Sequence, residues 1–265
     1  RRTVTEPTHD RQARLRAEVD DAPRISADDH RGISRRSFIT AGAAVAGGIL
    51  GFYGVQKRPE LGNIPDITRR AHQLNERIWS AAFRDEHLAP TFSPSESAIL
   101  RVNGRIGLGN QIDLAVWQLE VEAPDGTVLG THTLAEVQAL PKHEMIIEHK
   151  CVEGWSQITT WAGARFSDFQ AWYPRYADSA YVALETPGGD YYVGNGRATM
   201  DHPQTLLVYE MVGRPLDQEH GAPLRLATPL KYGIKQLKRI GVVRFSDEPP
   251  ADYWAERGYD YYAAL

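Results

Sequence analysis

The hydrophobic pattern changes from helical spacing to short strand-like runs near residue 97. Downstream of that point, apolar and β-branched residues gather in runs separated by Gly, Pro, Asn and Asp, as is typical of strands joined by turns. The pair Asp125-Gly126 predicts a hairpin turn after the second run. The runs predict strands at 98–104, 114–121, 144–150, 180–186, 191–194, 205–211, 223–228 and 238–245.

Helical spacing is clearest upstream of these runs. Between residues 66 and 83 the apolar positions recur at intervals of three or four, which predicts an amphipathic helix. Its apolar positions are Ile67, Ala71, Leu74, Ile78 and Ala82. Pro90 and Pro94 then interrupt the pattern. We therefore interpret residues 58–96 as a helical linker.

Two short helices are predicted between the strands. Thr133 with Glu136 three positions later forms a capping box, which predicts a helix within 131–140. A second short helix is predicted at 167–173. No repeat of fixed period is present. Strands joined by short helices predict an α+β domain over residues 97–265.

The first 57 residues have a different character. Residues 1–34 are polar, carry charges of both signs and lack apolar periodicity, which predicts disorder. Residues 35–57 begin with Arg35-Arg36 and continue as a weakly apolar Gly/Ala-rich run. A twin arginine before such a run is the signature of the Tat export pathway, which predicts a periplasmic or envelope location. The same run is near the lower length limit of a membrane anchor, and both readings stay open.

Composition narrows the classes of function. Hydrophobic residues make up 42% of the chain and charged residues 24%, which is ordinary for a soluble globular protein. A net charge of −4 gives no global basic excess, so we do not expect a nucleic-acid partner. One cysteine among 265 residues excludes an intrachain disulfide, a Cys-x-x-Cys-His haem site and cysteine-rich metal clusters.

The single cysteine, Cys151, is the first candidate for chemistry. It follows a predicted strand and begins the segment "CVEGWS". A lone cysteine is most often an inert buried side chain. His149 and Lys150 precede it and can favour the reactive thiolate, while Gly154 permits unusual backbone angles or a close ligand. A cysteine hydrolase using His143 or His149 as its base is an alternative, although neither spacing matches a hydrolase signature.

A second candidate lies at residues 219–240, where glycines and prolines alternate with basic residues. Backbone amides in glycine turns beside Arg and Lys suit a phosphate or another anion. A solvated basic face is the alternative, and the spacing alone does not separate the two. The basic residues are His220, Arg225, Lys231, Lys235, Lys238 and Arg239.

Together these segments resemble the molybdopterin-binding domain of the sulfite oxidase superfamily. The resemblance covers roughly residues 95–250 and rests on "CVEGWSQITTWAG" and "HPQTLLVYEMVGRPLDQEHGAPLRLATPLKYGIKQLKRI", in that order. It is strongest to the Tat-exported branch typified by the catalytic subunit of protein-methionine-sulfoxide reductase. It implies the mixed α+β sulfite-oxidase fold and an oxidoreductase that carries Mo-molybdopterin, one molybdenum on one pyranopterin dithiolene.

The resemblance also implies roles for individual residues. Cys151 matches the cysteine that ligates molybdenum, for which soft sulfur is suited. Glu153 and Trp155 are expected to shape the pocket around it. The positions that match cofactor-contacting residues of the family are Thr186, His220, Arg225, Gln236, Leu237 and Lys238. At His220 the reductase branch has an amide side chain, and a histidine there can still donate a hydrogen bond.

The chain departs from the family upstream. It lacks the "YNNFYEF"-like segment with which the reductase branch wraps the pterin, and has "FRDEHLAPTF" at the corresponding place. That segment is similar to the Phe-x-Arg-Asn-His segment of sulfite oxidases, which would put Arg84 and His87 at the pterin; a plain surface loop is the alternative. Lys150 and Arg165 are candidates for holding a sulfite-like anion. The C-terminal dimerisation domain of sulfite oxidases and a fused haem domain are not found in the sequence.

These observations predict a two-electron oxygen-atom transfer enzyme. Reduction of S-oxides such as protein methionine sulfoxide is one candidate reaction, and oxidation of sulfite is the other. Because no haem, flavin or iron–sulfur motif is present, we expect a redox partner such as a membrane haem b subunit or a cytochrome c. A binding module that keeps the fold without catalysis is a rival from a different class.

Overall fold

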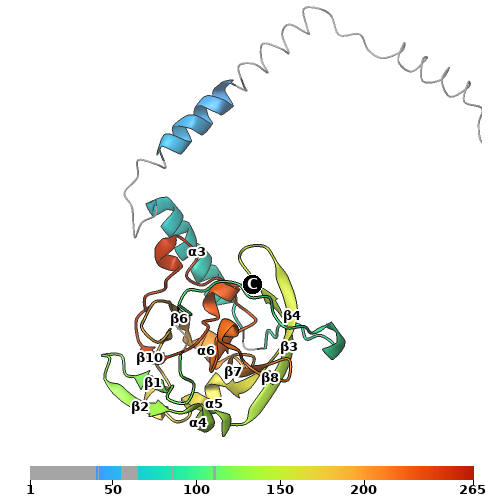
Figure 1. Ribbon diagram of the computed structural model, residues 1–265. Coiled ribbons are helices and arrows are strands. Elements are labelled where there is room, and N and C mark those ends of the chain that lie inside the picture. Colours follow the sequence, from blue (N-terminus) through green and yellow to red (C-terminus); the bar gives the residue numbers. More distant parts are fainter. Residues whose placement is uncertain (1–39, 41, 55–64, 85, 110–111) are drawn as a thin grey trace, which may run out of the picture. The chain divides into compact units, whose positions relative to one another are not determined.

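The computed structural model describes residues 40, 42–54, 65–84, 86–109 and 112–265 (Figure 1). Two compact units are present, Arg1–Arg58 and Pro59–Leu265. The predictions for residues 1–34 and for Arg35-Arg36 lie outside the described residues. In the first unit, residues 42–54 are helical. No helix in the described part of the chain combines the length and the apolar character needed to cross a membrane.

The second unit contains two five-stranded sheets. One has the order β2-β1-β10-β5-β6, and the other has β3-β4-β7-β8 with β9 also paired to β7. Among the strands of the described residues, β1 and β10 are the one pair that runs in parallel. The strands are β1 (Leu119–Glu122), β2 (Val128–His132), β3 (Lys142–Lys150), β4 (Ser156–Arg165), β5 (Tyr181–Glu185), β6 (Tyr192–Gly196), β7 (Leu206–Met211), β8 (Arg214–Pro215), β9 (Arg225–Ala227) and β10 (Val242–Ser246).

Short helices connect the strands, and one longer helix precedes them. The α-helices are α3 (Asp66–Ala82), α4 (Leu134–Gln138), α5 (Phe166–Gln170) and α6 (Arg197–Asp201). The 3-10 helices are η1 (Pro94–Glu96), η2 (Pro174–Tyr176), η3 (Gln218–His220), η4 (Gly233–Lys235) and η5 (Ala255–Arg257). The predicted α+β class, the helix at 66–83 and the capping box of α4 are all confirmed.

The longest pairing in the molecule joins β3 and β4, which form the long hairpin at one side of Figure 1. Beyond Trp161, β4 also pairs with β7, so its first half leaves one edge open. Ala98 donates its backbone N–H to the carbonyl of Ile158 at that edge. The prediction of a strand at 98–104 was wrong. The segment makes an isolated backbone hydrogen bond to β4 but not the repeated pattern of bonds that defines a strand pair. The strand at 114–121 is confirmed only over its last residues, as β1.

The hydrophobic core lies against both sheets. A large cluster combines side chains of β1, β5, β7, β9 and β10 with Phe166 and Phe169 of α5. A smaller cluster lies on β3, β4 and β7, around Trp161 and Ile147. The smaller cluster contains side chains of both strands of the β3–β4 hairpin, whose turn carries Cys151.

Candidate active site

Cys151 begins a tight turn that connects β3 to β4. Its N–H donates to the carbonyl of Trp155 (2.9 Å), and its own carbonyl accepts from the N–H of Gly154 (3.1 Å). Gly154 has a φ of +85°, a left-handed conformation that side chains with a Cβ adopt at a cost. The glycine of "CVEGWS" is thus explained by the turn. Cys151 lies at the end of its strand, as predicted.

The side chain of Cys151 lines a cavity of about 160 Å³. Four parts of the chain form the walls: the loop 100–106, the β3–β4 turn, residues 225–238 around η4, and the C-terminal segment with Trp254 and Tyr259. Tyr191 completes the lining. Segments far apart in the sequence therefore meet at one thiol.

Arg225 and Lys238 bring positive charge into this cavity. Arg225 is almost fully buried, stacks on the ring of Trp161 (4.5 Å to its centre) and donates to the carbonyls of His220 and Gln236. Burial lowers its pKa to about 10. Burial, followed by the charge of Arg225, lowers the pKa of Lys238 to about 8. Both side chains donate to backbone carbonyls and not to carboxylates. Their positive charge in the cavity wall is therefore not neutralised by an ion pair in these contacts.

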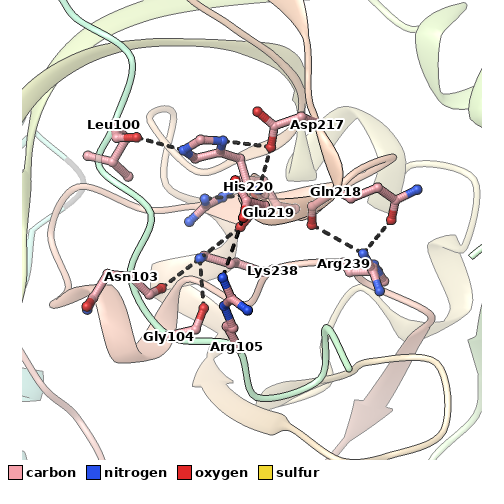
Figure 2. A network of polar contacts seen from close by, with 11 residues as sticks. Leu100, Asn103, Gly104, Arg105, Asp217, Gln218, Glu219, His220, Lys238 and Arg239 are labelled. Carbon is pink, nitrogen blue, oxygen red and sulfur yellow. Dashed lines mark hydrogen bonds and ion pairs between the residues drawn. The ribbon is translucent and has the colours of Figure 1, made fainter. Parts of the chain in front are cut away.

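Lys238 ties three chain segments together. Its Nζ donates to the carbonyls of Asn103 (2.7 Å), Gly104 (3.2 Å) and Glu219 (3.1 Å), as Figure 2 shows. His220 lies beside this network, bonded to Asp217 and to the carbonyl of Leu100. The loop 100–106 is therefore held onto the segment that the sequence assigned to the pterin.

The basic neighbours of Cys151 do not act as the sequence suggested. His149 lines the cavity, but burial and then the charge of Arg225 lower its pKa to about 3, so its ring is neutral. Lys150 is paired with Glu148 at 3.4 Å and is outside the lining. The structure therefore does not support the expectation that His149 and Lys150 favour the thiolate. The basic residues in the cavity lining besides His149 are Arg101, Arg225 and Lys238.

The predicted cofactor residues divide into two groups. Cys151, Arg225, Gln236 and Lys238 line the cavity together. The other three are outside the lining. Leu237 is packed in the core, and the hydroxyl of Thr186 bonds to the backbone of Tyr191. The backbone carbonyl of His220 accepts a hydrogen bond from Arg225. The cofactor contacts assigned to these three stay predictions.

The upstream candidates lie on the surface. Arg84 is exposed and donates to the carbonyls of Ala81 and Phe83, and His87 is exposed two residues before Ala89. Neither lines the cavity. Their contact with the pterin stays a prediction. The upstream segment that does reach Cys151 is the loop 100–106, with Asn103 Nδ2 at 3.8 Å from the sulfur.

Sequence reasoning missed Asn103 and Tyr191. Asn103 precedes Cys151 by 48 positions and carries no motif of its own. Tyr191 lies on the loop before β6, and its hydroxyl donates to the carbonyl of Ile234. The only sequence signal that could have located Asn103 was the glycine-rich stretch "NGRIG", which breaks the strand-like pattern. Glu153 and Trp155, by contrast, lie in the wall as expected.

The residues present fit an anionic, sulfur-ligated cofactor. Three buried polar atoms of the lining have no hydrogen-bond partner in the described part of the chain: His149 Nδ1, Arg225 Nε and Gln236 Oε1. They supply donor and acceptor groups beside two cations, as a pterin with a phosphate requires. No group of three His, Cys, Asp or Glu side chains among the described residues can hold a metal. The role of Cys151 as the metal ligand stays a prediction of the family resemblance.

Comparison with known proteins agrees with this geometry. Residues 107–254 match the family model described as the oxidoreductase molybdopterin binding domain. A chain of Azospira oryzae, provisionally named protein-methionine-sulfoxide reductase subunit YedZ1, is 36% identical over 72% of this chain and 73% of its own. The protein-methionine-sulfoxide reductase catalytic subunit MsrP of Burkholderia mallei is 28% identical over 89% of this chain and 76% of its own.

Other matches cover less of the matched protein. The MsrP of Xanthomonas campestris is 32% identical over 54% of this chain and 49% of its own length. Among solved structures, the sulfane dehydrogenase SoxCD from Paracoccus pantotrophus matches with a TM-score of 0.47 and 14% identity, over 62% of this chain and 50% of that chain. The family model covers more than half of the present chain. The chain belongs to the oxidoreductase molybdopterin-binding family, and it is a molybdenum oxidoreductase whose cofactor is Mo-molybdopterin.

Proposed function

We propose that this enzyme reduces S-oxides, with methionine sulfoxide in proteins as the substrate class. One observation carries the proposal. Four of the less buried residues that line the cavity at Cys151 are aromatic or aliphatic, namely Ile106, Trp155, Trp254 and Tyr259, and we take them as its rim, beside the exposed Arg101 and Glu153. Such a rim suits a thioether side chain, because sulfur packs favourably at aromatic edges. The names of the relatives from Azospira and Burkholderia support the same substrate class.

When bound, the cofactor supplies two-electron oxygen-atom transfer at molybdenum. The chain's own residues hold and orient the participants. Cys151 would ligate the metal, and Arg225 and Lys238 would hold the anionic end of the pterin. Asn103, beside the thiol, is placed to donate to a polar group that enters the cavity. The aromatic rim would keep water from the reacting atoms while a flexible protein segment presents its side chain.

Oxidation of sulfite is less well supported. The candidates for holding a sulfite-like anion were Lys150 and Arg165, and both lie outside the cavity lining. Arg84 and His87, from the segment that is similar to sulfite oxidases, lie outside the lining as well. Arg165 instead lines a separate hollow beside His143. The lining contributes one further arginine, Arg101, which stacks on Trp155 at 4.7 Å. One surface arginine at an apolar rim suits a sulfoxide better than a strongly hydrated dianion.

A cysteine hydrolase is also less well supported. His143 pairs with Asp168 and lines the hollow next to Arg165, outside the wall of the Cys151 cavity. A cysteine hydrolase needs a base that bonds to its thiol. His149 is neutral, but the side chain that bonds to the sulfur of Cys151 is that of Asn103. The pairing of nucleophile and base that such an enzyme requires is not formed.

We also propose that the enzyme works outside the cytoplasm with a separate electron donor. The twin arginine at positions 35 and 36 supports export by the Tat pathway. A membrane haem b subunit or a cytochrome c is the proposed donor. This part of the proposal rests on sequence motifs alone.

A stopped-flow experiment tests the reaction. Enzyme loaded with cofactor and chemically reduced should be reoxidised by methionine sulfoxide, free or within an oxidised protein. Oxidised enzyme mixed with sulfite should remain unreduced. A Tyr259→Lys variant, which places a charge on the rim, should raise KM for methionine sulfoxide and leave the molybdenum content unchanged. Rapid reduction by sulfite without turnover of methionine sulfoxide would overturn the proposal.

A further inference from the structure

Helix α3 turns its apolar face to solvent. Ile67, Leu74 and Ile78 are exposed by 41%, 59% and 56%, and Ala71, which shares their spacing, is exposed as well. Positions 67, 71, 74 and 78 are separated by four, three and four residues and therefore form one stripe along the helix. Trp79, which follows Ile78 in the sequence but lies about 100° from it around the helix, is 44% exposed. None of the residues of α3 is fully buried.

The opposite, polar face of α3 is the one that contacts the domain. Arg69 donates to the carbonyl of Ala255 at 3.0 Å, and the side-chain amide of Asn75 donates to the carboxylate of Asp260. Glu76 is half-buried, and its burial is the main cause of a raised pKa. An amphipathic helix on a soluble domain ordinarily buries its apolar stripe. Here the orientation is reversed, which leaves the stripe available to something outside the domain.

We propose that the apolar face of α3 (Ile67, Ala71, Leu74 and Ile78) lies in the interface of a lipid bilayer. A peripheral membrane helix combines an apolar stripe with arginines and an aromatic residue at the water boundary. Arg70 and Arg77, both exposed, lie along one edge of this stripe. Trp79 lies past Asn75, toward the face that contacts the domain, and is still 44% exposed near the end of the helix.

The upstream sequence favours lipid over another protein as the occupant. Residues 42–54 form a helix without a charged side chain, and its larger apolar residues are exposed: Val45, Ile49, Leu50, Phe52 and Tyr53. Asp66 follows Gly54 by only 12 positions. If the helix at residues 42–54 binds a bilayer, α3 follows closely in the chain and meets the same bilayer at a high effective concentration. Each of the two helical segments, taken by itself, exposes apolar side chains, and the second also carries exposed arginines.

This contact would orient the active site. The polar face of α3 binds the segment from Ala255 to Asp260, which contains Tyr259. Tyr259 and its neighbour Trp254 lie on the cavity rim. A domain held to the bilayer through α3 would thus present its rim in one fixed orientation. The binding does not depend on which substrate the cavity accepts, so it can fail while the proposed reaction holds.

The test uses the full chain loaded with cofactor and vesicles of phosphatidylethanolamine and phosphatidylglycerol. The variant Leu74→Glu/Ile78→Glu should lower vesicle partitioning by roughly tenfold, since two apolar side chains lose their lipid contact. Val128→Glu is the matched control, because Val128 is 51% exposed on β2, and its partitioning should equal that of the wild type. Molybdenum content and melting temperature should be unchanged in both variants.

A second readout separates α3 from the upstream helix. Brominated phospholipids should quench the emission of Trp79, obtained as the difference between wild type and Trp79→Phe. The quenching should disappear in Leu74→Glu/Ile78→Glu even where the chain still sediments with vesicles. Unquenched Trp79 in the vesicle-bound wild type would overturn the proposal. So would a dimer in sedimentation equilibrium that the double variant dissociates, since the face would then join two copies.

Discussion

The chemistry of Cys151 depends on residues that are distant in sequence. Its immediate neighbours contribute no free cation, because His149 is neutral and Lys150 is paired with Glu148. Positive charge comes from Arg225 and Lys238, more than seventy positions downstream. The sulfur predicted to ligate the metal and the buried cations predicted to hold an anion thus come from separate parts of the chain.

Replacing the thiol tests this division directly. We expect Cys151→Ser to lower the molybdenum content of the purified enzyme by about tenfold or more, because a hard hydroxyl replaces the sulfur ligand. Elemental analysis of molybdenum checks the expectation. Asn103→Ala is the comparison, since it removes the contact to the sulfur but no ligand, and should keep most of the metal. Full metal in Cys151→Ser would exclude Cys151 as the ligand.

A buried lysine outside the cavity predicts a dependence of stability on pH. Burial, followed by the charge of Lys235, lowers the pKa of Lys231 to about 6, and its Nζ lies over the ring of Tyr262. Between that pKa and the ordinary value of about 10.4, the unfolded chain holds a proton that the folded chain lacks. The free energy of unfolding should therefore rise with pH in this window.

The slope is at most about 1.4 kcal/mol per pH unit for one proton. Chemical denaturation between pH 6 and pH 9, in roughly unit steps, measures it. Lys231→Met should flatten the rise and be more stable than the wild type at neutral pH. An equal slope in both proteins would mean that Lys231 stays charged in the fold, held by Glu76 and Asp260, which oppose the lowered pKa.

At the residue scale, the sequence located the parts of the site that carry a motif. Cys151, Arg225, Gln236 and Lys238 were found because they belong to ordered, recognisable segments. Asn103 was not, because a loop residue has no periodicity and its contact with Cys151 spans 48 positions. The neutrality of His149 was equally hidden, since it follows from burial and from Arg225 rather than from any neighbour in sequence.

The β3–β4 hairpin is the element that makes the site. The sequence predicted β3 but not β4, although β4 is the longest strand. Most of β4 is buried, and Thr, Ala and Gly alternate with little change in polarity, so the period of two is lost. Pairing on both sides, with β3 and β7, fixes it as a strand despite its weak pattern. Tertiary context decided this element.

Two glycines of the hairpin should respond differently to alanine. A Cβ on Gly163 would lie 2.0 Å from the carbonyl oxygen of Leu207 on β7, whereas Gly154 has open space but a φ of +85°. We expect Gly163→Ala to cost about 2–4 kcal/mol through displaced backbone, and Gly154→Ala about 1 kcal/mol through backbone strain. Denaturant unfolding measures both. A larger loss of stability in Gly154→Ala than in Gly163→Ala would show that the turn tolerates a change of backbone less well than the strand does.

On the scale of the whole molecule, helix α3 and the C-terminal segment support each other. Asp260 accepts from Asn75 of α3 and from the backbone N–H groups of Tyr262 and Ala263. Tyr232, next to η4, donates its N–H to the carbonyl of Ala263. The helix that the sequence interpreted as a linker belongs to the same compact unit as the sheets. No pattern in the sequence indicates these contacts, because they are polar and join residues about 185 positions apart.

Removing the carboxylate of Asp260 should destabilise α3 and the C-terminal segment and leave the β3–β4 hairpin unaffected. We expect Asp260→Ala to cost about 1–2 kcal/mol and to raise amide hydrogen exchange in α3 and in residues 259–265, with β3 and β4 still protected. Asp125→Ala is the matched control, since Asp125 also accepts from a backbone N–H, in the β1–β2 turn. Hydrogen exchange read by mass spectrometry checks both. A uniform loss of protection would show that the unit opens only as a whole.

The cavity walls also set an order of events during synthesis. They are drawn from Leu100 at one end of the domain and Tyr259 at the other, with Cys151 and Lys238 between them. A nascent chain that has emerged only as far as the β3–β4 hairpin offers a thiol without the cations or the aromatic rim. The chain cannot enclose its pterin until the ribosome has released the last of these walls. Loading of the cofactor therefore follows the emergence of the chain at least as far as Tyr259.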